Sequence, residues 1–386
     1  MRRLRFAFIV DKSGPSYVGG YEGKVWNLAR RLAEQHEVRI YTSLELPSKT
    51  VERVLFLRLA SQRLSPPSKS GRSLAHGVVF SMTLASNPFG NWQPDVVTIE
   101  AIPYLHLWSS SRWLKTLKAF KILMVDEAWG AYSYWPDPLA SPSRHVIQSL
   151  LSSGMAAVDT VTATSSATQR SLVQLFGDKP SVQVLPDGVD STKIEQVLQR
   201  PEPVPIYDFV SVGRLVSIKR QEDFVAALAR LKRTAGWNGR AAIVGFGPLE
   251  HFIRERISSL GLGQNVELRT RTTDEDLYRI LSASRVFVLC SEREGFSRAT
   301  LEALAFGLPA IVARPPLPEV FGVSDFVGDG ENGLYFDLGR IDQLAARMER
   351  LLNDVAARRQ LSSRATAVRT SYDWNQIVRQ FLQLIP

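Results

Sequence analysis

Two glutamates stand in the most informative stretch of the sequence, residues 291–309. Glu294 lies in a loop after an apolar segment that ends at Cys290, and Glu302 lies in a helix expected to begin near Ser297. The free backbone N–H groups of a helix N-terminus favour an anionic phosphate. The Glu294 carboxylate can accept hydrogen bonds from sugar hydroxyls, and the Glu302 carboxylate can bind the vicinal diol of a ribose. The spacing alone could arise by chance on an acidic helix, but this strand, loop and helix context indicates a functional site.

Two cations follow another apolar segment, in the run from Val212 to Lys219. Arg214 offers a planar fork of donors and Lys219 a mobile point charge, and together they suit a pyrophosphate. Two cations at the end of a strand are more often simply solvated. The paired glutamates downstream favour the binding interpretation here.

Glycines mark two further loops. Gly19 and Gly20 lie between the first apolar segment and the first helical pattern, where a backbone without side chains can approach a ligand closely. This loop is neither a dinucleotide fingerprint nor a P-loop, and a plain flexible turn is the alternative interpretation. Gly247, in the turn 245–248, is interpreted as a loop position facing a nucleotide.

Apolar strands alternate with helical patterns through most of the chain, as in parallel sheets that are covered on both faces. Predicted strands before the proline-rich segment at residues 200–205 are 4–10, 38–42, 96–99, 122–125, 158–163 and 182–185, with a helix at 20–32. Predicted strands after it are 209–212, 241–244, 266–268, 286–289 and 309–312, with helices at 222–231, 249–260, 273–282 and 300–306. Two such halves predict two doubly wound α/β domains with a ligand site in the cleft between them.

The predicted domains are a first domain at residues 1–199, a linker at 200–206 and a second domain at 207–368. A final helix at 369–386 is expected to pack back toward the first domain. Alternating prolines cannot continue a helix, which is why the linker is placed at 200–206.

Composition excludes several classes of protein. The chain has 386 residues, 45% of them hydrophobic and 22% charged, which is ordinary for globular domains. A single cysteine excludes an intrachain disulfide framework, and no apolar run is long enough to span a membrane. The net charge of +9 suits phosphate-bearing ligands, anionic lipid or nucleic acid. The basic, then apolar N-terminus imitates a signal peptide but is interpreted as a first strand, which predicts a cytoplasmic protein.

Four motifs together resemble a known family. They are the Gly19–Gly20 loop, the segment Pro186–Asp190, Gly213-Arg-Leu-x3-Lys219 and Glu294-x7-Glu302. The set is similar to the GT-B-fold retaining glycosyltransferases of the glycosyltransferase family 4 type (glycosyl transferases group 1). The resemblance implies two Rossmann-like domains facing a central cleft, with the acceptor-side domain at residues 1–199 and the nucleotide-sugar-binding domain at 207–368. It also implies a hexosyltransferase-type enzyme that moves a sugar from a nucleotide-diphosphate sugar with retention, generally without a metal or other cofactor.

The resemblance also implies residue roles. Arg214 and Lys219 would bind the donor diphosphate, Glu294 the donor sugar and Glu302 the ribose. Further donor contacts would come from Gly19, Gly20, Gly247, Gly295, Phe296, Ser297 and Arg298. A same-face displacement, with a donor phosphate oxygen helping to deprotonate the acceptor, is a common proposal for the family.

The sequence departs from the family pattern at two positions. Asp126 stands where the family often carries a His near the donor sugar, and Ser297 stands where a Gly is common. We include Asp126 with Glu294, Lys219 and Arg214 as candidate catalytic residues. The alternative is that Asp126 simply finishes a strand.

Acceptor recognition is expected in the first domain, for a glycan, a glycolipid or a small molecule. The run 104–121 mixes large apolar and basic residues, as an interfacial helix on the inner, anionic face of a membrane would. A core-facing helix with a solvated basic face would look the same and is slightly favoured. The aromatic residues Trp129, Tyr132, Tyr134 and Trp135 suit either stacking on an acceptor sugar or packing of a loop.

Two other functions compete with glycosyl transfer. A nucleotide-sugar epimerase of the same fold would rearrange the donor without an acceptor. A basic nucleic-acid-binding protein would explain the charge, but the charge is dispersed and no reader motif accompanies it. The sequence therefore favours a glycosyltransferase that does not bind nucleic acid.

Overall fold

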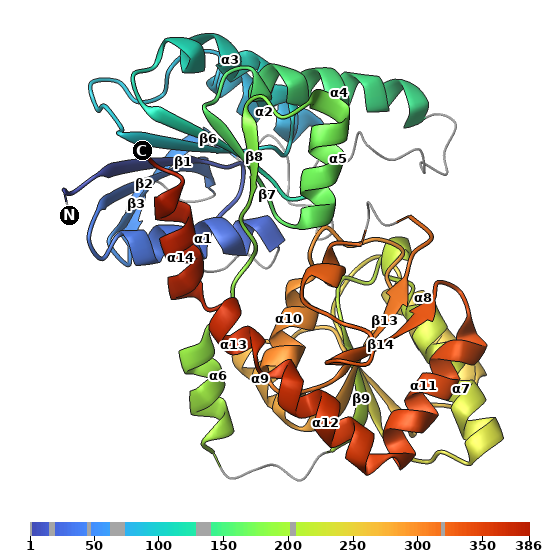
Figure 1. The fold of residues 1–386 in the computed structure, drawn as a ribbon. Helices are drawn as coiled ribbons and strands as arrows, with labels where there is room; N and C mark the ends of the chain where they lie inside the picture. The colour runs from blue at the N-terminus through green and yellow to red at the C-terminus, as the bar shows by residue number, and fades with distance from the viewer. Residues whose placement is uncertain are drawn as a thin grey trace. The chain divides into compact units, whose positions relative to one another are not determined.

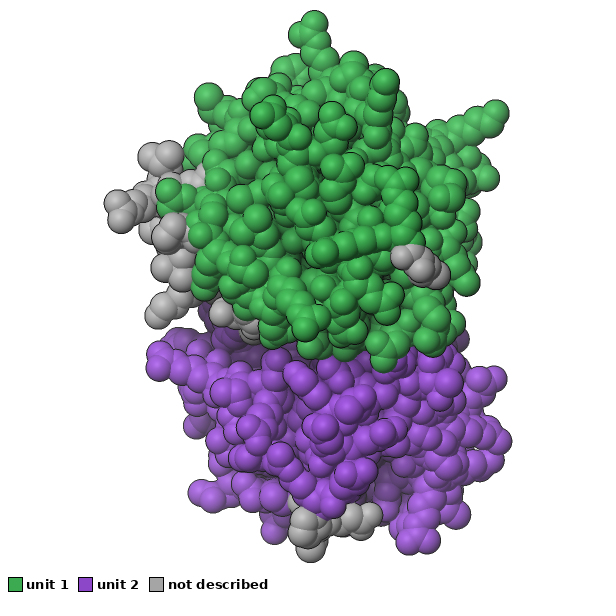
Figure 2. Space-filling model, turned by 90° about the vertical axis from the view of Figure 1, so that its left-hand side faces the viewer, with its two compact units in different colours: residues 1–187, 374–386 green, residues 188–373 purple. Residues whose placement is uncertain are grey.

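The computed structural model describes residues 2–14, 20–44, 48–61, 74–128, 140–200, 206–317 and 321–386. The chain divides into two compact units (Figure 2): unit 1 is Met1–Asp187 with Trp374–Pro386, and unit 2 is Gly188–Asp373. We expected the first domain to extend to residue 199, whereas the division falls after Asp187. Helix α6 (Ser191–Leu198) belongs to unit 2 because it packs against α9 (Asp274–Ser282). Most of the predicted linker, residues 201–205, lies outside the described residues.

The described part of unit 1 contains an eight-stranded sheet in the order β3-β4-β2-β1-β5-β6-β7-β8 (Figure 1). Its strands are parallel except for the edge strand β3, which runs antiparallel to β4. The strands are β1 (Arg5–Ile9), β2 (Glu37–Leu44), β3 (Lys49–Val51), β4 (Val54–Ser61), β5 (Val96–Glu100), β6 (Phe120–Val125), β7 (Thr160–Ala163) and β8 (Ser181–Val184). The helices are α1 (Gly20–Leu32), α2 (Leu74–Thr83), α3 (Leu105–Thr116), α4 (Ala140–Met155), α5 (Ser166–Phe176) and α14 (Trp374–Gln383).

Both faces of the unit 1 sheet are covered. Successive side chains of a strand point to opposite faces, so Phe6 and Phe8 of β1 join one core while Ala7 and Ile9 join the other. Helices α1 and α14 cover the first face, and α2, α3, α4 and α5 cover the second. The final helix thus lies in unit 1 and packs beside α1, although it follows all of unit 2 in the sequence (Figure 1).

Unit 2 contains a six-stranded parallel sheet in the order β11-β10-β9-β12-β13-β14 within its described residues. Its strands are β9 (Tyr207–Val212), β10 (Ala241–Val244), β11 (Val266–Arg269), β12 (Ser284–Leu289), β13 (Ala310–Arg314) and β14 (Gly333–Asp337). Its helices, besides α6 and α9, are α7 (Gln221–Ala235), α8 (Glu250–Ser259), α10 (Arg298–Ala305), α11 (Ile341–Asn353), α12 (Val355–Ala365) and α13 (Val368–Ser371). Helices α7, α8 and α11 cover one face, and α6, α9 and α10 cover the other (Figure 1).

The predicted alternation is therefore confirmed: the chain folds as two doubly wound α/β units. The predicted helix at residues 20–32 has the bounds of α1. The hairpin of β3 and β4 was not predicted, because its turn residues Glu52 and Arg53 adopt positive φ angles of 46° and 66°. Such turns usually contain Asn or Gly, and this one carries neither signal. Within the parts of the chain that the structure describes, every helix is too short or too polar to cross a bilayer.

Candidate functional site

The topology of unit 2 brings two distant loops together. The chain passes from β9 through β10 to β11 and then returns to place β12 on the other side of β9. Because β9 and β12 are parallel neighbours, the loops after them leave the same edge of the sheet. Ligands of open α/β sheets bind at such a point, where the order of the strands reverses. We call this place, with Arg214, Lys219, Glu294 and the start of α10, the switch-point site.

Lys219 and Glu294 form the centre of the switch-point site. The Lys219 Nζ atom lies 2.5 Å from Glu294 Oε1, and the Ser291 hydroxyl donates a hydrogen bond of 2.7 Å to the same oxygen. Glu294 Oε2 has no partner among the described residues. The sequence predicted separate contacts for these two side chains, and the structure joins them in one ion pair. The pair offers a largely buried cation together with one carboxylate oxygen that is open to a further hydrogen bond.

Arg214 is held at the same edge through its backbone. The Gln221 side chain donates a hydrogen bond of 2.9 Å to the Arg214 carbonyl, and the exposed guanidinium has no partner within the described ranges. Arg220, which sequence analysis did not single out, forms ion pairs with Asp223 at 2.7 Å and Glu292 at 3.4 Å. Arg220 thereby ties the two loops together, while the Arg214 guanidinium is available to a ligand.

Gly247 has a packing role that the sequence did not reveal. A Cβ atom on Gly247 would lie 2.4 Å from the Leu215 carbonyl oxygen, and one on Gly245 would lie 1.8 Å from the Gly213 oxygen. The Leu215 amide also donates a hydrogen bond of 2.9 Å to the Phe246 carbonyl. These two glycines allow the turn after β10 to lie directly against the loop that carries Arg214. Direct contact of Gly247 with a donor stays a prediction.

The N-terminus of α10 completes the switch-point site. Its cap residue Ser297 has a φ of 80°, in the left-handed region that favours glycine. This conformation explains physically why a glycine suits the position. The Phe296 ring is buried against Phe326, so only the backbone of Phe296 is available to a ligand. The first amides of α10, starting at Arg298, lack acceptors within the helix, as at any helix start. With Gly295 just before them, these groups lie directly after Glu294 in the chain.

Glu302 lies on the second turn of α10. Its Oε1 atom is 3.7 Å from the Arg298 Nε atom, and burial raises the pKa of its carboxyl group, against the attraction of Arg298. A largely buried carboxyl group with one cationic neighbour is chemically suited to accept hydrogen bonds from a diol. The predicted ribose contact is compatible with this environment and stays a prediction.

The predicted site residues of unit 1 lie at the carboxyl edge of its sheet. Gly20 is the first residue of α1, whereas Gly19 lies outside the described residues. Asp126 directly follows β6 and accepts a hydrogen bond of 3.1 Å from the Thr164 hydroxyl. Lys24, which sequence analysis missed, lies 3.7 Å from the same Asp126 oxygen. The predicted aromatic contacts at residues 129–135 also lie outside the described residues.

Lys24 and Glu100 are buried polar residues on elements that otherwise contribute apolar side chains to the core. Lys24 precedes Leu28 and Leu32 at four-residue intervals on the core-facing side of α1, and this register was the available signal. Glu100 ends β5, all of which is buried. Burial raises the pKa of Glu100 well above its usual range, and the nearby charge of Asp126 raises it further.

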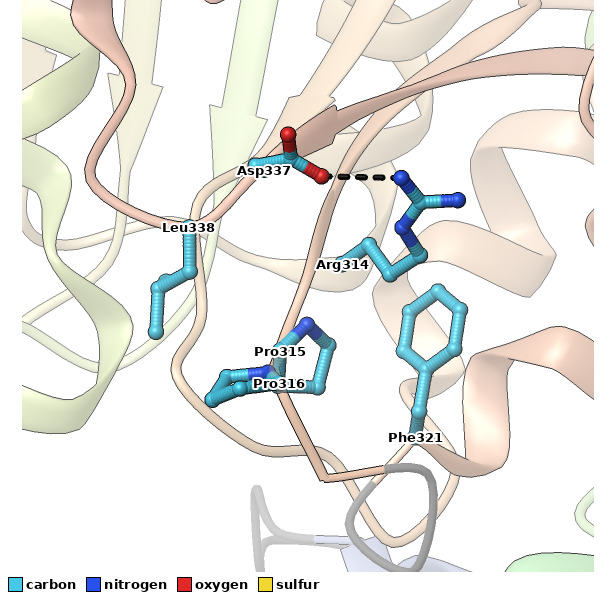
Figure 3. A pocket seen from close by; sticks show the side chains of 6 residues that line it. All are labelled: Arg314, Pro315, Pro316, Phe321, Asp337 and Leu338. Atoms are coloured by element: carbon cyan, nitrogen blue, oxygen red, sulfur yellow. Dashed lines mark hydrogen bonds and ion pairs between the residues drawn. The ribbon is translucent and has the colours of Figure 1, made fainter.

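A cavity of about 420 Å³ lies where β13 and β14 end (Figure 3). Arg314 at the end of β13 and Asp337 at the end of β14 form an ion pair of 2.8 Å at its rim. Pro315, Pro316, Phe321 and Leu338 complete its lining. The backbone of Phe321 pairs with that of Glu294, so the cavity and the switch-point site share a wall.

Two protein-family models match the chain. The model described as Glycosyltransferase Family 4 matches residues 18–193, and the model described as Glycosyl transferases group 1 matches residues 191–368. Between them they cover most of both units. The chain belongs to the GT-B glycosyltransferases of the family 4 type. The predicted fold class and family are therefore confirmed.

Individual proteins agree with this assignment. The glycosyltransferase is 25% identical over 390 residues to D-inositol 3-phosphate glycosyltransferase of Nocardia farcinica, covering 89% of this chain and 82% of the relative. Among solved structures, sucrose-phosphate synthase of Thermosynechococcus elongatus matches with a TM-score of 0.80 and 20% identity, covering 99% and 98% of the two chains. Anabaena HepE in complex with UDP-glucose matches with a TM-score of 0.73 and 17% identity over 99% of both chains. None of these three is named as an epimerase or a nucleic-acid-binding protein, so those alternatives gain no support.

Proposed function

We propose that this glycosyltransferase transfers a hexose, with retention and without a metal, from a nucleotide-diphosphate sugar to a glycan, glycolipid or small-molecule acceptor. The observation that carries the proposal is the convergence of Lys219, Glu294, Arg214 and the start of α10 at one strand-order reversal. Cations, a carboxylate and the first amides of α10 at a strand-order reversal support diphosphate binding, because ligands of this architecture bind at such a point.

The proposed chemistry is electrostatic. When a sugar leaves a nucleotide diphosphate, negative charge builds on the departing phosphate, and fixed cations and amides lower the energy of that transition state. Arg214 would supply a planar fork of donors and Lys219 a point charge, while the first turn of α10 would add its amides. The open oxygen of Glu294 would accept a hydrogen bond from a hydroxyl of the donor sugar. A same-face displacement, with a donor phosphate oxygen assisting deprotonation of the acceptor, suits this arrangement.

Support for the donor class comes from the comparisons. HepE, which shares the fold, binds UDP-glucose. The resemblance of the motifs around Arg214, Lys219, Glu294 and Glu302 to the family supports the same donor chemistry and retention in this chain.

Product analysis tests the proposal. The purified protein is incubated with nucleotide-diphosphate hexoses and candidate acceptors, with and without EDTA, and the products are separated by mass and anomeric configuration. We expect a glycosylated acceptor with the donor's anomeric configuration, unaffected by EDTA. Lys219→Ala and Glu294→Ala should reduce transfer by at least about a hundredfold while the protein stays folded, since each removes a charge-assisted contact. Lys232→Ala removes a comparable lysine elsewhere in unit 2 and should leave the rate unchanged.

Four outcomes would contradict the proposal. Inversion at the anomeric carbon would refute retention, and loss of activity in EDTA would refute metal independence. Epimerised donor with no transfer product would favour the epimerase alternative. Wild-type rates in Lys219→Ala or Glu294→Ala would remove the assigned site.

Unit 1 also carries a surface that suits an anionic membrane. Three neighbouring helices each expose a large apolar side chain: Met82 of α2 is 70% exposed, Trp108 of α3 64% and Val146 of α4 58%. Arg112 and Lys115 follow Trp108 on the same exposed face of α3, while Leu107 and Leu114 face the core. Exposed apolar side chains on three adjacent helices, with two basic residues beside Trp108, favour the membrane interpretation over a core-facing helix with a basic outer face. We therefore propose a cytoplasmic enzyme that binds the inner membrane face peripherally.

Vesicle flotation tests the membrane proposal. We expect the protein to float with vesicles that contain anionic phosphatidylglycerol and to remain unbound with neutral phosphatidylcholine vesicles, because basic side chains require a negative surface. Trp108→Ser should weaken flotation several-fold, and Phe252→Ser, at an exposed aromatic residue of unit 2, should not. Equal behaviour on both vesicle types would refute this part of the proposal.

A further inference from the structure

A buried lysine organises the carboxyl edge of the unit 1 sheet. The Lys24 side chain is only 1% exposed. Its Nζ atom donates hydrogen bonds of 3.0 Å to the Thr164 hydroxyl and 2.6 Å to the Leu185 carbonyl. A lysine is almost never buried to this degree unless it is paired. Lys24 therefore links α1 to the segments that follow β7 and β8.

The same lysine holds one oxygen of Asp126. Asp126 Oδ1 lies 3.7 Å from the Lys24 ammonium and accepts the Thr164 hydroxyl at 3.1 Å. Thr164 accepts from Lys24 and donates to Asp126, so the three groups form a continuous chain of hydrogen bonding that is polarised toward the carboxylate. The Thr164 amide also donates to the Val125 carbonyl at 3.2 Å, which fixes the backbone beside Asp126.

The second oxygen of Asp126 remains open. The Asp126 side chain is 19% exposed, and its Oδ2 atom has no partner among the residues that the structure describes. A carboxylate with one oxygen fixed and the other accessible is oriented to accept a hydrogen bond from a ligand. Its position after β6 puts it at the edge of the sheet where ligands of this fold bind.

The surrounding charges make the lysine necessary to this arrangement. Glu100 is buried, and burial raises its pKa. The negative charges of Asp126, Glu22 and Asp11 raise its pKa further, while the positive charge of Lys24 lowers it. Lys24 is thus a cation among four carboxyl groups, one of which, Asp11, also lies 3.9 Å from the buried His76 ring. A lysine that served only to join strand ends would need the Leu185 carbonyl but not this acidic neighbourhood.

We propose that Lys24 is a positioning residue for Asp126, whose open oxygen Oδ2 accepts a hydrogen bond from a hydroxyl of the sugar substrate. The inference rests on the proposed glycosyl transfer and adds the residue that controls this contact. Lys24 is too deeply buried to touch the substrate and acts through Asp126 and Thr164. The Lys24 ammonium and the Thr164 hydroxyl thus orient the Asp126 carboxylate, so that its Oδ2 atom can accept the hydrogen bond.

A double-mutant cycle tests the inference. Steady-state kcat/KM for transfer is measured on the wild type, Asp126→Asn, Lys24→Met and the double variant, with the melting temperature of each. We expect each single change to lower kcat/KM by about tenfold to a hundredfold, the range for a charge-assisted hydrogen bond. The kcat/KM of the double variant should lie within about threefold of that of the less active single variant, because both changes remove the same contact.

Two further variants keep the test decisive. Thr164→Val is nearly isosteric and retains Lys24, so it provides a test if Lys24→Met does not fold. It should lower kcat/KM several-fold when introduced into the wild type. It should have no such effect when introduced into Asp126→Asn. Lys232→Met is the matched control, because Lys232 also binds a carbonyl, that of Gly261, at 3.0 Å but lies in unit 2. It should leave kcat/KM unchanged.

The opposing results are distinct. Effects of Lys24→Met and Asp126→Asn that multiply, or wild-type rates in either Lys24→Met or Thr164→Val, would overturn the positioning role while transfer by the wild type stands. Absence of transfer by the wild type with every nucleotide sugar would overturn the proposed function together with this inference.

Discussion

Individual residues at the switch-point site contribute through their neighbours. Glu294 receives both the Lys219 ammonium and the Ser291 hydroxyl on one oxygen. Motif spacing identified Lys219 and Glu294 as candidates, but their contact depends on the adjacency of β9 and β12, which no local pattern reports. Lys24, Thr164 and Glu100 were missed because their partners lie in distant segments of the chain. Lys24 and Glu100 are, in addition, polar residues on elements that otherwise face the core.

Ser297 provides a test of backbone strain at the start of α10. Its left-handed conformation costs a non-glycine residue about 1 kcal/mol, so Ser297→Gly should maintain or raise the melting temperature and keep transfer within a few-fold of wild type. Ser258→Gly, an exposed position inside the right-handed helix α8, should lower the melting temperature instead. A marked loss of stability in Ser297→Gly would show that the hydrogen bond of 2.8 Å between the Ser297 and Thr300 hydroxyls outweighs the strain.

Glu100 predicts a pH dependence of stability. Burial raises its pKa, so the folded chain holds this proton more tightly than the unfolded chain. The stabilisation is complete below the usual glutamate range and is lost as the pH rises through the raised pKa. Glutamine does not titrate, so the melting temperature of Glu100→Gln relative to wild type should increase from about pH 5 to about pH 8.

An exposed glutamate gives the control for this series. Glu34→Gln in the same unit should show no such trend across the pH range. A constant difference between Glu100→Gln and wild type would mean that Glu100 is ionised throughout, and that Lys24 compensates two carboxylates.

At the scale of elements, two strand-order reversals position the chemistry, one between β9 and β12 and one between β1 and β5. Continuous apolar runs predicted most strands of both sheets, because strands covered on both faces have no polar alternation. The edge hairpin of β3 and β4 was not predicted, because Glu52 and Arg53 adopt positive φ angles that are not typical of their residue types.

Helix α14 should be essential to unit 1. Phe381 is fully buried, with ring centroids 6.1 Å from Phe6 and 6.2 Å from Phe8. Phe381→Ala should cost about 3–5 kcal/mol of the free energy of unfolding in urea, since it removes a core aromatic ring and leaves a cavity. Phe252→Ala at an exposed position of α8 should change it by no more than about 0.5 kcal/mol. A similarly small effect of Phe381→Ala would contradict the packing of α14 in unit 1.

At the scale of the whole molecule, the chain repeats one architectural solution twice. The two family models meet at residues 191–193, close to the boundary between the two units after Asp187. The proline-rich segment suggested a later boundary, because composition marks a break in helical structure but not which helix packs on which unit. The excess of positive charge, +9 overall, suits a phosphate-bearing donor.

Nucleotide binding measured by thermal shift tests the central claim most directly, that the switch-point site holds a diphosphate. Nucleoside monophosphates, diphosphates and nucleotide sugars are each added to the wild type, Arg214→Ala, Lys219→Ala and the control Lys232→Ala. We predict that at least one diphosphate raises the melting temperature by about 5 °C near a hundredfold excess over Kd. Arg214→Ala and Lys219→Ala should weaken that binding about tenfold or more, and Lys232→Ala should not. A diphosphate that binds all four proteins equally, or no shift with any diphosphate, would contradict the account.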